Sequence, residues 1–222
     1  MNIGIIGAGH IGGTLARRFA ALGHQVTLAN SRGPESLAVQ AAEAGVTPAS
    51  AEQAARGRDL VVVSIPLKNI PDLPKDLFAG EPEDLPVVDT SNYYPRQRDG
   101  QIEAIESGLT ESRWVELQIG HPVVKAFNNI FAKHLLELGQ PAGTPNRIAL
   151  PVAGDNAAAK AKVMDVIDQM GFDAVDAGTI EESWKQQPGS PVYAGDHAAE
   201  DLAKALAQAR PERGSEWRFP LK

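Results

Sequence analysis

The 222-residue chain contains no cysteine, which excludes disulfides, a thiolate nucleophile and cysteine-based metal sites. Aromatic residues make up only 5% of the chain, and no apolar run approaches the roughly 20 residues that span a bilayer. Basic residues are outnumbered by acidic ones, and the net charge of −7 argues against nucleic acid as a partner. No basic segment precedes the first apolar run, so no signal peptide is expected. We therefore expect a cytoplasmic globular protein that binds neither nucleic acid nor membrane.

The first 32 residues predict a strand, a turn, a helix and a second strand in direct succession. An apolar run at 2–6 leads without a spacer into Gly7-Ala8-Gly9-His10-Ile11-Gly12. Apolar residues at helical spacing predict a helix over 11–22, and 24–29 returns as a strand. A Gly-x-Gly-x-x-Gly motif is a weak signal alone, but here both flanking elements of a dinucleotide-binding unit are present. The alternative is a glycine-rich connection that binds nothing.

Each glycine of this motif has its own expected task. Gly7 makes the tight turn, Gly9 lets the backbone approach a pyrophosphate, and Gly12 lets the helix pack on its strand. The N-terminus of the helix directs unpaired N–H groups and a positive dipole end at the phosphates.

The end of the second strand indicates which dinucleotide binds. An NAD site has Asp or Glu there to accept from the ribose 2′-hydroxyl, whereas this chain has Asn30-Ser31-Arg32. A carboxylate would repel a 2′-phosphate, but an amide, a hydroxyl and a guanidinium all donate to it. The sequence therefore predicts NADP as cofactor. The alternative is that 31–34 is only a polar turn before the next helix.

The rest of the chain continues the alternation of helices and strands. The fold predicted is α/β: a Rossmann-type, doubly wound, mostly parallel sheet with a small C-terminal α/β appendage. A linker at 139–146 divides an NADP-binding domain, 1–138, from a segment, 147–222. We expect this segment to complete the site for the molecule that reacts with the bound cofactor, which we call the acceptor, and to form a dimer interface. Further strands are expected at 59–66, 86–90, 123–127, 147–153 and 172–176. Helices are expected at 34–44, 50–57, 75–78, 102–107, 110–118 and 155–170, and a last one, capped by Asp196, runs to about 209. A polar tail is expected from 211 onward.

Several separated motifs resemble one family in the same order. They are residues 5–12, 30–32, 64–66, 89–92, 124–129 and 171–178. Together they resemble the NADP oxidoreductases called coenzyme F420-dependent, with the cytosolic reductase domain of the six-transmembrane ferric reductases as a relative. The resemblance covers about residues 1 to 180. It implies a Rossmann domain that holds NADP(H), hydride transfer to a deazaflavin or flavin ring, and a homodimer.

The resemblance also implies positions for the site. The cofactor-binding residues would be Gly7, Gly9, His10, Ile11, Gly12, Asn30, Ser31, Arg32, Ser64, Ile65, Pro66, Asn92, Ala126 and Asn128. Apart from the resemblance, we expect the acceptor to meet Tyr93 and Trp184, whose rings could stack on it, and Asn129, which follows the strand at 123–127. Archaeal enzymes acting on coenzyme F420 tend to have His at the position of Asn128, where the ferric-reductase relatives have Asn. The segment 181–189 matches neither group, which leaves the acceptor open.

Other interpretations compete with this one. Lys125 and Asn128 could form a catalytic pair like that of hydroxyacid dehydrogenases, but that family sets its pair on a large helical domain. His121 precedes a buried strand and is expected to be structural, and no histidine pair has metal-ligand spacing. The aromatic residues Tyr93, Tyr94, Trp184 and Tyr193 either pack in the core or stack on a flat acceptor.

No catalytic acid or base is assigned, which suits hydride transfer to a conjugated ring. Such a reaction depends on positioning, whereas reduction of a ketone would also need a proton donor. The alternatives are a catalytically silent sensor that binds NADP(H), and a dehydrogenase or imine reductase acting on a small carbonyl or imine.

Overall fold

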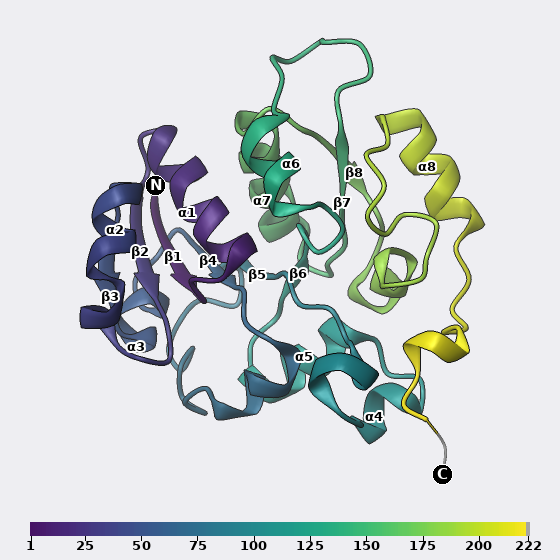
Figure 1. The fold of residues 1–222 in the computed structure, drawn as a ribbon, viewed down its shortest axis with the longest axis horizontal. Coiled ribbons are helices and arrows are strands. Elements are labelled where there is room, and N and C mark those ends of the chain that lie inside the picture. The colour runs from purple at the N-terminus through teal and green to yellow at the C-terminus, as the bar shows by residue number, and fades with distance from the viewer. Residues whose placement is uncertain (221–222) are drawn as a thin grey trace.

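The fold is built on a six-stranded parallel sheet, in a computed structural model that describes residues 1–220. The strand order is β3-β2-β1-β4-β5-β6, which reverses direction beside β1 as in a doubly wound sheet (Figure 1). The strands are β1 (Asn2–Ile6), β2 (Gln25–Ala29), β3 (Thr47–Ala49), β4 (Leu60–Val63), β5 (Val87–Asp89) and β6 (Val124–Lys125). The predicted fold class is confirmed.

Both faces of the sheet are buried, as the apolar runs of the sequence require. In β4, Leu60 and Val62 enter the core on one face, while Val61 and Val63 enter the core on the other. The first face is covered by α1 (His10–Ala21), α6 (Ala132–Glu137) and α7 (Ala157–Gln169). The second face is covered by α3 (Ala51–Ala55), the 3₁₀ helix η2 (Leu67–Asp72) and α5 (Glu111–Ile119).

The C-terminal segment forms a small second sheet of two parallel strands, β7 (Ala149–Val152) and β8 (Asp173–Asp176). It lies between α7 and α8 (Ala199–Gln208), to the right of the main sheet in Figure 1. Backbone hydrogen bonds in both directions between Lys125 and Ala153 connect it to β6.

The apolar face of α7 packs in the same core as α1. Val163, Val166 and Ile167 share one hydrophobic cluster with Leu15 and Phe19. This face is therefore buried within a single chain, and a second subunit is not needed to cover it.

Several local elements differ from those expected. The strand β3 was not predicted because it has three residues and contains Pro48, which an edge strand tolerates. The helix expected at 75–78 is wrong: those residues form turns, and the helical turn lies earlier, in η2. Asp196 does not cap α8, whose N-cap is Ala198. The Asp196 carboxylate instead lies 2.7 Å from His134 Nδ1. The helix α6 was not predicted either.

The polar tail expected from residue 211 onward folds back over the molecule. It crosses α4 (Glu103–Glu106) and α5 and includes the 3₁₀ turn η5 (Ser215–Trp217). We refer to residues 209–220 as the C-terminal tail; residues 221 and 222 of the predicted tail lie outside the described part.

Other elements are η1 (Pro34–Leu37), α2 (Ala38–Ala44), a π turn η3 (Pro95–Asp99) and η4 (Ile180–Gln186). No helix within 1–220 has the length and apolarity to cross a membrane.

Candidate functional site

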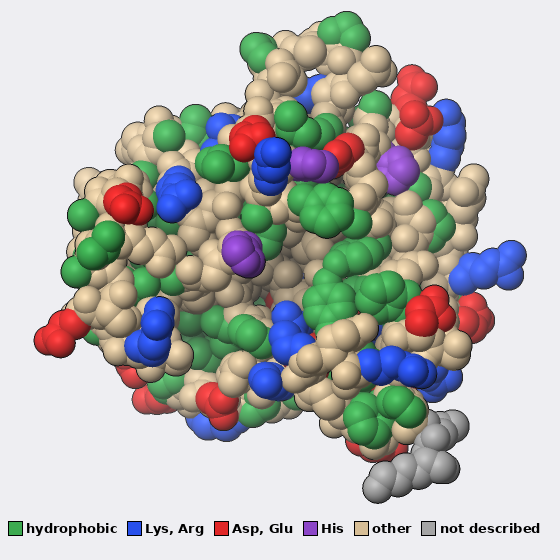
Figure 2. Space-filling model, viewed as in Figure 1, with side chains coloured by type: hydrophobic (Ala, Val, Ile, Leu, Met, Phe, Trp, Pro, Cys, Tyr) green, Lys and Arg blue, Asp and Glu red, His purple; other side chains and the backbone are tan. Residues whose placement is uncertain are grey.

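A cleft of about 680 Å³ opens at the carboxyl ends of β1, β2 and β4. Ligands of open α/β sheets bind at this edge, where the strand order reverses. The space-filling view shows a hollow near the centre of the molecule, between the nucleotide-binding part and the C-terminal part (Figure 2). The residues lining the cleft are Ile6–Gly9, Asn30–Gly33, Ser50–Glu52, Ser64–Pro66, Asn69 and Asp72–Pro74.

The three glycines of the turn stand in three different environments. Gly7 has a φ of 115°, and a Cβ there would lie 2.1 Å from the Ser64 backbone oxygen. A Cβ on Gly12 would lie 1.9 Å from the Gly7 backbone oxygen, so only glycine lets α1 approach this closely. At Gly9 nothing lies within 4 Å of the added Cβ. The backbone at Gly9 is thus open to a ligand.

The N-terminus of α1 faces the same space. Gly9 is its N-cap, and the first turn has no acidic residue. Among residues 1–220, no side chain caps this end of the helix. Unpaired N–H groups together with the helix dipole favour an anion there. The turn therefore fits a pyrophosphate.

The Asn30–Arg32 loop is shaped by its own hydrogen bonds. Asn30 Oδ1 accepts from the Arg32 backbone N–H at 2.9 Å, and Asn30 Nδ2 donates to Ser36 Oγ at 3.0 Å. The amide of Asn30 is therefore used to form an Asx turn. Ser31 and Arg32 remain exposed at the rim of the cleft, and their side chains are the donors available to a ligand.

Two carboxylates also line the cleft, Glu52 and Asp72. The pKa of Glu52 is lowered, first by the hydrogen bond from its own backbone and then by one from Ser50. Glu52 is therefore ionised at neutral pH, at the N-terminus of α3. The rim of the cleft thus carries charges of both signs, with Arg32 on one loop and Glu52 on another.

The ends of β5 and β6 are joined by two asparagines. Asn92 Nδ2 donates to the Asn128 backbone oxygen at 2.8 Å, and Asn128 Nδ2 donates to Asn92 Oδ1 at 2.9 Å. Asn128 also donates to the Gln186 backbone oxygen, and Gln186 Nε2 donates to Asn128 Oδ1. This brings η4 of the C-terminal segment against the strand ends.

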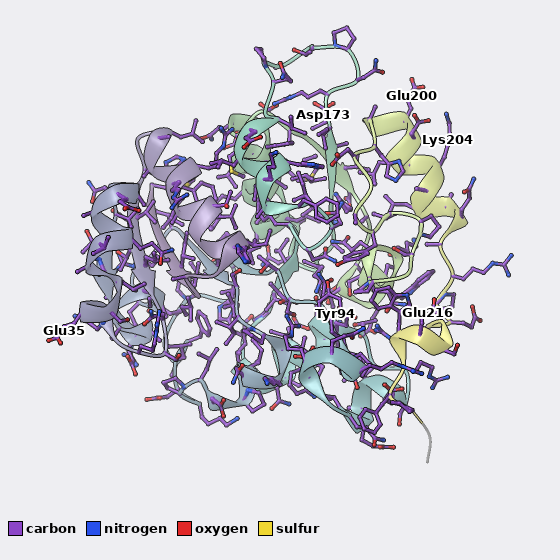
Figure 3. The ribbon with its side chains drawn as sticks, in the orientation of Figure 1. Glu35, Tyr94, Asp173, Glu200, Lys204 and Glu216 are labelled. Atoms are coloured by element: carbon purple, nitrogen blue, oxygen red, sulfur yellow. The ribbon has the colours of Figure 1, made fainter. Side chains whose placement is uncertain are left out.

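Three aromatic side chains from distant segments gather beside this pair. The hydroxyls of Tyr94 and Tyr193 are hydrogen-bonded, and the Trp217 ring lies 6.1 Å and 6.2 Å from theirs. Burial, followed by the bond to Tyr193, raises the pKa of Tyr94, so its hydroxyl stays protonated. Figure 3 places Tyr94 near the centre of the view, where Figure 2 shows hydrophobic side chains beside the hollow. We call Tyr94, Tyr193 and Trp217 the aromatic wall.

The aromatic wall is tied to the asparagine pair through the backbone. Tyr94 is two residues after Asn92, and the Ala194 N–H after Tyr193 donates to the Asn129 backbone oxygen at 3.0 Å. The guanidinium of Arg98 lies 4.9 Å from the centre of the Tyr94 ring and donates to the Asn92 backbone oxygen at 2.5 Å. The wall therefore flanks the edge formed by Asn92 and Asn128.

The predicted cofactor residues fall into three groups in the structure. Eight line the cleft: Gly7, Gly9, Asn30, Ser31, Arg32, Ser64, Ile65 and Pro66. His10, Ile11 and Gly12 begin α1, with Gly12 buried against the turn. Asn92, Ala126 and Asn128 lie at the neighbouring strand ends, where Ala126 is fully buried.

The three predicted acceptor residues lie in three different environments. Tyr93 is fully buried, and its hydroxyl donates to the Gly100 backbone oxygen, so it has no ring face for an acceptor. Trp184 lines a separate cavity of about 300 Å³, beside α4 and the tail, which shares no lining residue with the cleft. Asn129 is 2% exposed, and neither atom of its amide has a hydrogen-bond partner within the described chain.

Several residues of the site were not predicted from the sequence. Gln186, Arg98 and Trp217 lie in irregular segments that carry no periodic pattern, and only the departure of residues 181–189 from the related families pointed to that region. His121 is buried between the backbone oxygens of Pro82 and Pro122, as expected for a structural residue. Within residues 1–220, no group of three or more His, Asp or Glu side chains could hold a metal.

Comparison with known proteins gives consistent matches. Residues 2–93 match the family described as NADP oxidoreductase coenzyme F420-dependent. The crystal structure of the hypothetical protein SMa0349 from Sinorhizobium meliloti is 32% identical, with a TM-score of 0.76 over 89% of this chain and 95% of that one. A structure from Arthrobacter sp. FB24, provisionally named an F420-dependent NADP reductase, is 26% identical, with a TM-score of 0.66 over 81% and 86%.

A curated relative matches a shorter stretch. YjhV of Escherichia coli (strain K12) is 40% identical over 74 residues, which are 33% of this chain and 54% of that protein. This chain thus matches about half the length of that relative.

Proposed function

The chain belongs to the family described as NADP oxidoreductase coenzyme F420-dependent, and from this membership we propose that it transfers hydride between NADPH and a flat redox acceptor. The acceptor is a deazaflavin such as coenzyme F420, or a flavin. When bound, NADPH supplies the hydride from its nicotinamide ring. The residues of the chain bind, orient and shield the two rings.

The proposal is carried by the edge next to the cleft. The strand ends present Ser64, Pro66, Asn92 and Asn128, none of which exchanges a proton near neutral pH. The amide of Asn128 already bonds to Asn92 and Gln186, and amides are not general acids. Hydride transfer to a conjugated ring depends on holding the hydride-donating carbon against the receiving atom, which is C5 of a deazaflavin or N5 of a flavin, and positioning can supply about 7–11 kcal/mol of the barrier. The proton that completes the reduction of the ring comes from solvent. A ketone reductase would need a proton donor at this edge.

The preference for NADP follows from the rim of the cleft. Within residues 1–220, no hydrogen bond is seen from the side chains of Ser31 and Arg32, so both can donate to a 2′-phosphate, whereas the Asn30 amide is used within its own loop. A guanidinium can meet a phosphate with two parallel hydrogen bonds. We propose that these two side chains distinguish NADP(H) from NAD(H).

The aromatic wall supports a flat acceptor. Its three rings stand beside the asparagine pair, and none belongs to the predicted nucleotide cleft. Stacking on an aromatic ring contributes about 0.5–1.5 kcal/mol beyond the buried area. The wall thus replaces Tyr93 and Trp184 as the proposed surface for the acceptor.

The first test measures binding and turnover separately. NADPH binding is followed by its fluorescence, and NADPH oxidation at 340 nm is then measured with coenzyme F420, FMN, FAD, riboflavin and a small cyclic imine. We expect oxidation with at least one flavin or deazaflavin. Binding without oxidation of NADPH by any acceptor would support a sensor, and oxidation with the imine alone would support an imine reductase.

A pair of variants tests the aromatic wall. Tyr193→Leu removes a ring and should raise the KM for the acceptor roughly 2- to 10-fold, from the stacking energy above. Tyr193→Phe keeps the ring and loses only the hydroxyl, so it is the matched control and should change the KM less. Equal effects of the two variants would refute stacking at this position.

Two proposals concern assembly. The C-terminal segment contributes Gln186 and Tyr193 to the site, so we propose that it completes the acceptor site within one chain. The homodimer stays a prediction from the family, and the solution mass by light scattering tests it. A monomer that turns over normally would remove the dimer without affecting the acceptor site.

A further inference from the structure

Four charged side chains meet beneath the edge formed by Asn92 and Asn128, which we call the acceptor edge. We call this buried cluster the charge network. Lys125 Nζ lies 3.1 Å from Asp89 Oδ2 and 3.8 Å from Glu111 Oε2. Arg213 Nη2 lies 2.9 Å from Glu111 Oε1. The side chains of Lys125, Asp89 and Glu111 are 1%, 0% and 3% exposed, and that of Arg213 is 9% exposed. Two anions and two cations thus share one enclosed space.

The network is balanced only when the C-terminal tail is in place. Asp89, Glu111 and Lys125 come from β5, α5 and β6, and together they carry a formal charge of −1. Arg213 comes from the tail and brings this charge to zero. Removing one partner of a buried ion pair is strongly destabilising because the other charge is left uncompensated. Glu111 Oε2 has no hydrogen-bond partner in the described chain, so its charge depends on the two cations.

The network also holds the loop that carries Asn92. Lys125 Nζ donates to the Ser91 backbone oxygen, and the Ser91 N–H donates to Asp89 Oδ1 at 2.9 Å. The next residue is Asn92, which pairs with Asn128, three residues after Lys125. Lys125 therefore supports both asparagines, one through its side chain and the other through its own strand.

The tail reaches the acceptor edge by a second route. Arg213 Nη2 also donates to Gln187 Oε1 at 2.8 Å, beside Gln186, which binds Asn128. Four residues later, Trp217 packs in the aromatic wall. Arg213 is thus placed between the charge network and η4, at a point where its loss would affect both.

We infer that Arg213 is a positioning residue of the acceptor site: it neutralises the charge network and thereby fixes the Ser91–Asn92 loop against Asn128. This inference rests on the proposed function, because the edge it positions is the one assigned to the nicotinamide and the acceptor. Arg213 does not line the cleft. Its effect is transmitted through Glu111 and Lys125.

The test compares three variants of the full-length protein. Arg213→Ala leaves the network with a net negative charge. Glu111→Gln together with Arg213→Gln removes one charge of each sign, so the remaining Asp89–Lys125 pair is balanced. Arg210→Ala is the matched control, since Arg210 is an exposed arginine of the same tail for which no ion pair is seen within residues 1–220.

We expect Arg213→Ala to lower kcat/KM for the acceptor roughly 10- to 100-fold, since a misplacement of about 1 Å can cost 10²-fold. The Kd for NADPH should change less than about twofold, because the glycine turn and Arg32 lie outside the network. The double variant should recover at least half of the loss on a logarithmic scale, and Arg210→Ala should match wild type. A double variant as impaired as Arg213→Ala would overturn the charge-balance role, and a wild-type-like Arg213→Ala would overturn the whole inference.

Two further readouts separate this inference from the proposed function. They are the urea midpoint of unfolding and the emission of bound NADPH, which reports the surroundings of its nicotinamide. If wild type binds NADPH but oxidises it with no acceptor, the proposed function fails and these two readouts decide the inference. Arg213→Ala should then lower the midpoint and change the emission, with recovery in the double variant. Unchanged values of both would overturn it.

Discussion

Arg32 offers the most direct test of cofactor choice. Its guanidinium is exposed at the rim of the cleft, and its backbone is held by the 2.9 Å hydrogen bond to Asn30 Oδ1. Substitution by alanine therefore removes the side chain without undoing the loop. A hydrogen bond to a charged group contributes about 1.5–3 kcal/mol. Because the site is exposed we take the lower figure, which corresponds to roughly tenfold in affinity.

The assay is a fluorescence titration with NADPH and with NADH. Arg32→Ala should raise the Kd for NADPH about tenfold and leave that for NADH within about twofold, and the difference should shrink as salt is added. Arg17→Ala is the matched control, since Arg17 is exposed on α1 and does not line the cleft. Asn30→Asp forms a second arm: the carboxylate can still accept from the Arg32 N–H, but its charge repels a 2′-phosphate.

The reasoning can be refuted in two ways. An Arg32→Ala variant that keeps its preference for NADPH would show that the 2′-phosphate binds elsewhere. An equal loss for both cofactors would show that Arg32 acts on a group they share, such as the pyrophosphate. In either outcome Glu52, the ionised carboxylate in the same cleft, would be the next residue to examine.

Three further predictions concern the glycine turn, the buried His121 and the exposed Glu182. Gly12→Ala should lower both the melting temperature and NADPH affinity, because its Cβ would lie 1.9 Å from a backbone oxygen. Gly9→Ala, whose Cβ would have nothing within 4 Å among residues 1–220, should weaken NADPH binding in a normally folded protein. Equal melting temperatures of these two variants would contradict this. His121→Gln should lower the urea midpoint yet keep turnover, and a loss of about 10⁴-fold in kcat would instead mark a general acid. The pKa of Glu182 is lowered to about 2, first by a hydrogen bond from a lysine, so its stabilisation is present above about pH 4.5 and is lost as the pH falls through 2. Glu182→Gln should therefore cost about 0.5–1 kcal/mol at pH 7, a small value because the group is exposed, and urea unfolding at pH 3 should show most of the difference gone.

The nucleotide-binding half could be predicted from the sequence because its signals are local. The glycines, the helix and both strands lie within 32 consecutive residues, and each signal constrains the same backbone. The use of Asn30 could not be predicted, since an amide at a strand end can donate to a ligand or close a turn. In the structure the Asn30 amide closes the turn, because Asn30 Nδ2 donates to Ser36 six residues later.

The proposed acceptor site could be predicted only in outline. Tyr93 and Tyr94 are adjacent in an irregular loop, so no period tells which ring is buried; the π turn at 95–99 sends Tyr93 inward and Tyr94 toward Tyr193. The ion pair between Glu111 and Arg213 joins residues 102 positions apart, and no local sequence pattern at either residue indicates that they pair. Such pairs are set by the tertiary fold alone.

This difference has a consequence for how the two halves respond to substitution. The cofactor turn is one contiguous stretch, whereas the acceptor edge is assembled from the ends of β5 and β6, from η4, and from the tail. Tyr94 follows β5, Tyr193 follows η4 and Trp217 belongs to the tail, so the aromatic wall forms only where these three segments come together. A substitution in the tail can therefore alter the binding of the proposed acceptor without changing the glycine turn. We expect acceptor choice in this fold to vary with the tail and η4, and cofactor choice with the loop at Arg32.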